Sequence, residues 1–105
     1  MFNINGVEWQ IKKASPFHPM LFRSDGSLSI GSCDNDTKTI YLNEYLSGAA
    51  LKKVLTHEIT HAAMFSYGVS LSIEQEELLA NLIATYGDEI IAITNKIFRK
   101  IKNGS

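Results

Sequence analysis

The hydrophobic pattern of the chain changes character near residue 47. Before this point, short runs of alternating or β-branched residues are separated by turn residues, which predicts β-strands. After it, apolar residues recur at spacings of three and four, which predicts amphipathic helices. The pattern therefore predicts an α+β domain in which a small antiparallel sheet is followed by two or three helices.

The first strands are expected on either side of Asn5-Gly6. Asn-Gly suits a type I′ turn because both central residues of this turn need positive φ. Phe2 to Ile4 and Val7 to Ile11 alternate around it, so we predict a β-hairpin over residues 1 to 13. Pro16 and Pro19 then exclude a central strand or a helix interior.

A second antiparallel pair is predicted over residues 28 to 33 and 37 to 42, joined by the polar turn Asp34-Asn35-Asp36. Thr37 to Leu42 has two possible places in the sheet. It could be an edge strand that binds an extended peptide by strand addition, or it could be fully paired.

The first helix should be capped by Ser47 and begin near Gly48 or Ala49. Gly68 is well placed to end it in the left-handed conformation. The apolar residues that predict this helix are Leu51, Val54, Leu55, Ile59, Ala62, Ala63 and Phe65.

The second helix should begin after Ser72, which forms a capping box with Gln75. Asp88 can cap a third helix, or the second helix continues with a kink at Gly87. The apolar stripe expected to face the core consists of Leu78, Leu79, Leu82 and Ile83.

Length and composition indicate one globular domain, over residues 1 to 105, with 45% hydrophobic and 20% charged residues. A net charge of −1 argues against a nucleic-acid partner. The single cysteine, Cys33, excludes an intrachain disulfide. We expect no membrane span and no secretory signal, and hence a cytoplasmic location.

The chemistry of the chain is indicated by His57-Glu58-Ile59-Thr60-His61, an H-E-x-x-H motif inside the first predicted helix. Residues i and i+4 lie on one face of a helix, so the two imidazoles can bind one Zn²⁺. Glu58 would then act as general base towards a zinc-activated water.

Catalytic zinc usually has three protein ligands, so a third ligand must come from elsewhere in the chain. His18 is the only other histidine. A short loop should pack the second helix against the first, so a glutamate in its early turns can reach the motif. We favour Glu77, with Glu76 close behind, and the pattern alone does not separate them. The downstream carboxylates are Glu74, Glu76, Glu77, Asp88 and Glu89.

Residues 57 to 84 resemble the gluzincin metallopeptidases of the ImmA/IrrE type. In that family H-E-x-x-H is followed by a helix bearing E-x-x-A-N, whose glutamate is the third zinc ligand. Glu77-Leu78-Leu79-Ala80-Asn81 matches this pattern. The resemblance implies a minimal zincin-like fold, zinc as cofactor, His57, His61 and Glu77 as ligands, and hydrolysis of a peptide or protein substrate.

The whole chain is more loosely similar to small phage and prophage proteins of Gram-positive bacteria. Gly6-Val7-Glu8-Trp9 and Thr39-Ile40-Tyr41-Leu42 carry this similarity. Residues 57 to 68 also resemble SprT-type metalloproteases that act on DNA-bound proteins. Their third ligand is a downstream histidine, and no histidine follows His61, so this second resemblance ranks lower.

Four further features have a functional and a structural interpretation. Tyr86 could donate to an oxyanion, but packing at a helix end is favoured. His18 could bind substrate, but a loop residue with no functional role is favoured. Cys33 could be an inhibitory thiolate, but a small buried hydrophobic residue is favoured. The cationic cluster, expected to be a solvated face rather than a partner site, is Lys96, Arg99, Lys100 and Lys102.

The sequence thus predicts a zinc-dependent metallopeptidase in which Glu58 is the general base and general acid. The alternative is a non-catalytic accessory protein that uses the same scaffold to bind a partner. A purely structural zinc site is disfavoured, since such sites normally have four protein ligands.

Overall fold

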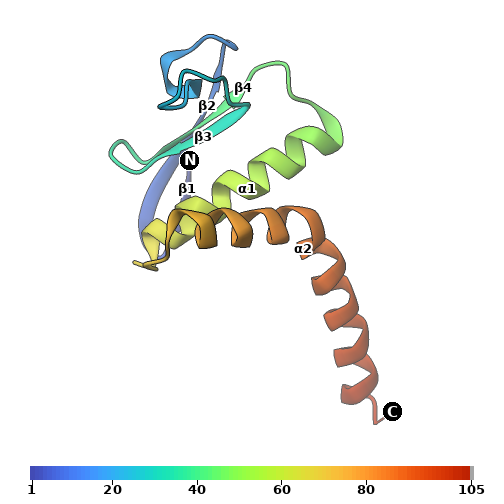
Figure 1. Cartoon of the computed structure of the whole chain (residues 1–105). Coiled ribbons are helices and arrows are strands. Elements are labelled where there is room, and N and C mark those ends of the chain that lie inside the picture. Colours follow the sequence, from blue (N-terminus) through green and yellow to red (C-terminus); the bar gives the residue numbers. More distant parts are fainter. Residues whose placement is uncertain (105) are drawn as a thin grey trace.

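The protein consists of a four-stranded sheet and two helices, which confirms the α+β class (Figure 1). Our computed structural model describes residues 1–104. The elements in chain order are β1 (Phe2–Ile4), β2 (Val7–Ala14), the short 3₁₀ helix η1 (Pro19–Leu21), β3 (Gly31–Asp34), β4 (Thr39–Asn43), α1 (Gly48–Ser66) and α2 (Ile73–Lys102).

The predicted N-terminal hairpin is confirmed. β1 and β2 pair antiparallel, and Ile4 faces Val7 across the turn. Asn5 and Gly6 have φ of 50° and 77°, as a type I′ turn requires. The Asn5 side chain donates a hydrogen bond to the carbonyl of Ser66, which ties the hairpin to the end of α1.

The second predicted pair is also confirmed, because β3 and β4 run antiparallel. The strand order is β1-β2-β4-β3, and β2 pairs with β4 in parallel. The sheet is therefore mixed rather than purely antiparallel, because a non-local pairing joins the two local pairs. β4 is paired on both sides, which excludes it as an edge strand; the edge next to α1 is β3.

The hydrophobic core lies between the sheet and α1, as expected from the pattern of both. Trp9, Ile40, Leu42 and Ala62 are buried together. The indole N–H of Trp9 donates to the hydroxyl of Ser66 at 2.8 Å, so the largest core side chain is also satisfied at its polar end. This packing holds α1 against the sheet and fixes the face that carries the motif.

α1 begins and ends where the sequence predicts. Ser47 takes the N-cap position, but its side chain makes no capping hydrogen bond. Gly68 follows the helix with φ of 65°, and the Val69 N–H bonds to the carbonyl of Met64.

α2 is one continuous helix of 30 residues, so Asp88 does not begin a third. The predicted capping box of Ser72 and Gln75 is present. Figure 1 shows that α2 changes direction partway along and that its second half extends away from the sheet and α1. No helix in the described part of the chain combines the length and apolar content that crossing a membrane requires.

The expectation that an apolar stripe of α2 faces the core is wrong. Leu78, Leu82 and Ile83 are 71%, 47% and 37% exposed, and Leu79 is only partly buried. The one fully buried residue of α2 is Ala80. A small residue at the helix contact permits close approach of the two backbones. This close approach brings the glutamates of α2 within reach of the histidines on α1.

Candidate metal centre

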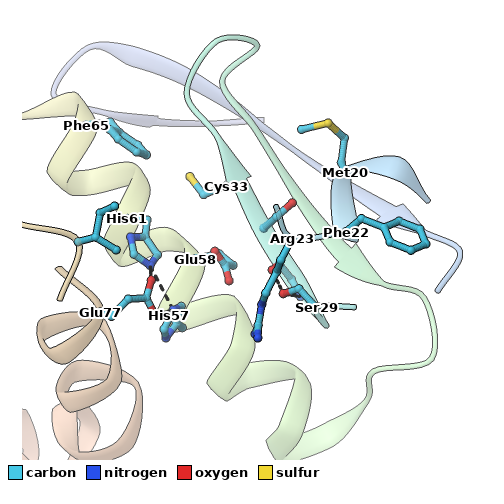
Figure 2. A pocket seen from close by; sticks show the side chains of 13 residues that line it. Met20, Phe22, Arg23, Ser29, Cys33, His57, Glu58, His61, Phe65 and Glu77 are labelled. Carbon is cyan, nitrogen blue, oxygen red and sulfur yellow. Dashed lines mark hydrogen bonds and ion pairs between the residues drawn. The ribbon is translucent and has the colours of Figure 1, made fainter. Parts of the chain in front are cut away.

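The two motif histidines lie side by side on α1, as their spacing predicts (Figure 2). Their ring centroids are 4.9 Å apart, and their Nε2 atoms are 3.1 Å apart. Both side chains are largely buried, with 19% exposure for His57 and 12% for His61. Two nitrogen atoms thus point at a common position.

Glu77 reaches this position from α2. Its carboxylate oxygens lie 2.8 Å from Nε2 of His61 and 3.3 Å from Nε2 of His57. The three side chains form a group whose ligand atoms all lie within 4.8 Å of one another. The structure therefore brings together the three residues that the sequence proposes as ligands.

Glu76 contacts the opposite side of the His61 ring, at 2.6 Å from Nδ1. The Glu76 side chain is only 18% exposed. With the ring proton on Nδ1 and donated to this carboxylate, the lone pair of Nε2 faces Glu77 and His57. Adjacent glutamates therefore have different surroundings, and Glu76 occupies the place of an outer carboxylate that orients a metal-binding histidine.

The geometry fits zinc. Two ligands bound at about 2.1 Å in tetrahedral geometry lie roughly 3.4 Å apart. The observed separations of 2.8, 3.1 and 3.3 Å between the converging atoms come close to this value. Two imidazole nitrogens and one carboxylate oxygen are also a known donor set of catalytic zinc.

Electrostatics keep His57 in the form that binds metal. Burial lowers the pKa of His57 below its usual value, and the neighbouring His61 acts in the same direction, while Glu77 opposes them. The neutral imidazole is thereby favoured, and only the neutral ring offers a lone pair to a cation.

Glu58 is the most buried ionisable residue of the motif, at 7% exposure. Burial raises its pKa to about 7; His61 lowers it and Glu77 raises it further. A carboxyl with a pKa near neutrality can both accept and return a proton. The side chain lies between the histidine pair and β3 (Figure 2).

An open cleft surrounds the site. Two cavities, of about 540 and 500 Å³, adjoin it, and His57, Glu58 and Glu77 line both. This volume lies in the range of small-molecule and peptide-side-chain pockets. The first cavity has an apolar rim formed by Met20, Phe22, Phe65 and Ile73.

β3 forms one wall of this cleft through Gly31, Ser32 and Cys33. A Cβ on Gly31 would lie 2.7 Å from Cγ1 of Val54 and 3.2 Å from Glu58, so only glycine fits here. The hydroxyl of Ser32 is buried and has no hydrogen-bond partner in residues 1–104.

The other residues that the sequence analysis considered lie away from the histidine–glutamate group or line only the cavity beside it. His18 accepts a hydrogen bond from the Met20 N–H and stacks on Tyr41, which is a structural role. Tyr86 lines neither of the two cavities and is 52% exposed. Cys33 lines the first cavity, where burial raises the pKa of its thiol to about 12, with Glu58 adding to the effect.

Sequence reasoning missed Arg23 and Gly31. Arg23 lines both cavities, although it lies in the loop before β3. No periodicity marks a loop cation, so nothing local distinguishes it from a surface arginine. The sequence did contain a sign of the role of Gly31, because an isolated glycine within a strand pattern suggests close approach of another segment.

Comparison with known proteins supports this description. A metallopeptidase family model, described as the IrrE N-terminal-like domain, matches residues 17–94. The chain belongs to this family. The matched residues include the loop with Arg23, β3, the whole of α1 and the α2 glutamates, and thus every side chain of the candidate metal centre. Searches of curated proteins and of solved structures give no match.

Proposed function

We propose that the protein is a zinc-dependent peptidase in which His57, His61 and Glu77 bind the metal. The observation that carries this proposal is the convergence of two Nε2 atoms and one carboxylate beside a buried glutamate in an open cleft. Three protein ligands leave a position free for a water molecule, as in catalytic zinc sites.

Zinc, when bound, would acidify water and polarise the peptide carbonyl. Glu58 supplies the proton chemistry of the reaction. It accepts a proton from the attacking water and returns it to the leaving amine. Its burial next to the histidines and its raised pKa support this assignment. Glu76 holds the His61 ring in one tautomer through its Nδ1 atom.

An extended peptide is the substrate that the cleft favours. β3 pairs with β4 on one side, and no strand of residues 1–104 pairs with its other side. A free strand edge beside the metal ligands can bind a peptide backbone by strand addition. The apolar rim of the first cavity would accept a hydrophobic side chain of that peptide. A bacterial cytoplasmic setting is part of the same proposal and rests on the resemblance of the sequence to small phage and prophage proteins.

The test is a peptide-library digest read by mass spectrometry, with zinc-loaded wild type and Glu58→Gln compared at equal zinc content. We expect cleavage by the wild type and a rate lower by about 10²–10⁴-fold in the variant, because only proton transfer is removed. Chelation should abolish wild-type cleavage, and zinc should restore it.

A wild type that binds zinc but cleaves no peptide would contradict the peptidase proposal. That result would favour the accessory-protein alternative, in which the same cleft binds a partner without turnover.

A further inference from the structure

The second half of α2 presents an apolar surface that nothing in residues 1–104 covers. Six large side chains within this stretch are each at least 50% exposed. Figure 1 shows this half of α2 extending clear of the sheet and α1. Contiguous apolar surface of this kind marks an interaction site on a soluble protein. The six residues are Ile90, Ile91, Ile93, Ile97, Phe98 and Ile101.

The spacing of these residues suits another helix. Ile83, Tyr86, Ile90, Ile93 and Ile97 follow one another at alternating intervals of three and four. This is the heptad spacing of coiled coils, in which such residues form the seam between two helices. Tyr86 is 52% exposed, so the seam is accessible from Tyr86 onwards, whereas Ile83 lines two cavities together with Thr56 of α1.

The charges on this half of α2 are divided along its length. Asp88 and Glu89 lie at its start, whereas Lys96, Arg99, Lys100 and Lys102 lie towards its end. A parallel pair of such helices would place like charges side by side. An antiparallel pair would place the acidic start of each helix beside the basic end of the other, which is favourable.

We propose that two copies of this chain associate through their α2 helices in an antiparallel coiled coil. In the register that pairs the segment from Tyr86 to Ile97 with the same segment of the partner, every layer is apolar, and Ile90 packs against Ile93 of the partner subunit. Tyr86 then packs against Ile97 of the partner subunit, and the acidic side chain of Glu89 lies beside Lys96 of the partner subunit. The two metal centres lie outside the paired segment, so this association is independent of the proposed catalysis.

Sedimentation equilibrium of the full chain tests the pairing. Ile93→Glu places a charge in the seam and should weaken the dimer at least about a hundredfold, because an unpaired charge would be buried. The control is Ala92→Glu, which adds the same charge on the neighbouring residue, exposed and outside the seam, and should leave the dimer intact. Circular dichroism confirms that both variants keep their helices.

A charge swap tests the orientation. Glu89→Lys alone and Lys96→Glu alone should each weaken the dimer, and the double variant should restore it. These residues are seven apart in one helix and do not pair within a chain. Rescue therefore reports contact between two chains and, in this register, an antiparallel one.

A wild type that stays monomeric at about 100 µM would overturn the proposal, since mass action favours the dimer there. A dimer that survives Ile93→Glu, or a charge swap without rescue, would overturn it as well. Binding of a monomer to anionic vesicles would assign this face to a membrane surface instead.

Discussion

At the residue scale, two adjacent glutamates of α2 take different positions at one histidine. Glu77 points at the Nε2 atoms of both histidines, and Glu76 points at Nδ1 of His61. The sequence placed both near the motif but did not separate them, because a one-residue step on a helix surface is not visible in the apolar pattern. Only the packing of α2 on α1 decides which carboxylate faces the converging nitrogens.

Glu76→Gln should lower zinc affinity by about 10–100-fold without removing the site, because the His61 ring loses its charged acceptor but keeps Nε2. Competition with a chromogenic chelator measures this affinity. Glu74→Gln is the matched control, since Glu74 is exposed in the same helix turn. Equal affinity of Glu76→Gln and wild type would contradict a positioning role for Glu76.

Cys33 should react slowly with alkylating reagents in the folded, metal-free protein. Burial holds the pKa of its thiol at about 12, so the neutral form dominates at pH 8 and the reactive thiolate increases only as the pH rises towards 12. Alkylation by iodoacetamide at pH 8 should be roughly a thousandfold slower than for the unfolded chain. Mass spectrometry of both states follows the reaction, and equal rates would show that the thiol is not buried as described.

At the element scale, the site depends on how closely β3 approaches α1. Gly31 allows this approach, because a Cβ there would overlap Val54. Gly31→Ala should destabilise the fold by about 1–3 kcal/mol through overpacking and displace Glu58. Chemical denaturation measures the change. The double variant Gly31→Ala with Val54→Ala should recover part of the loss, because the overlapping methyl group is removed; a single variant as stable as wild type would contradict the close contact.

Local signals predicted the elements of this fold well. The Asn5-Gly6 turn and the capping box of Ser72 and Gln75 were correct, because both depend on residues close in sequence. The parallel pairing of β2 with β4 was not predicted, since it joins segments that no local pattern connects. The α2 stripe was wrong because Ala80, rather than the leucines, makes the helix contact.

At the scale of the whole molecule, the candidate metal centre lies where α1 and α2 pack against each other, beside the buried Ala80 of α2. His57 and His61 belong to α1, which packs on the sheet, whereas Glu77 belongs to α2. The exposed ion pair of Lys52 with Asp88 also links the two helices, but such surface pairs contribute little. A bound ion would add to the packing that holds the first half of α2 against α1. The second half of α2 projects away from this contact, and the longest extent of the molecule is 55 Å.

The central claim is that one ion binds to His57, His61 and Glu77. Zinc per chain, determined by elemental analysis and by titration calorimetry, tests this claim on the wild type, Glu77→Ala and the exposed control Glu74→Ala. The account predicts about one zinc ion per chain in the wild type and the control, and a sharp loss in Glu77→Ala, because two histidines alone bind weakly. Full zinc content in Glu77→Ala, or a wild type that takes up no zinc, would contradict it.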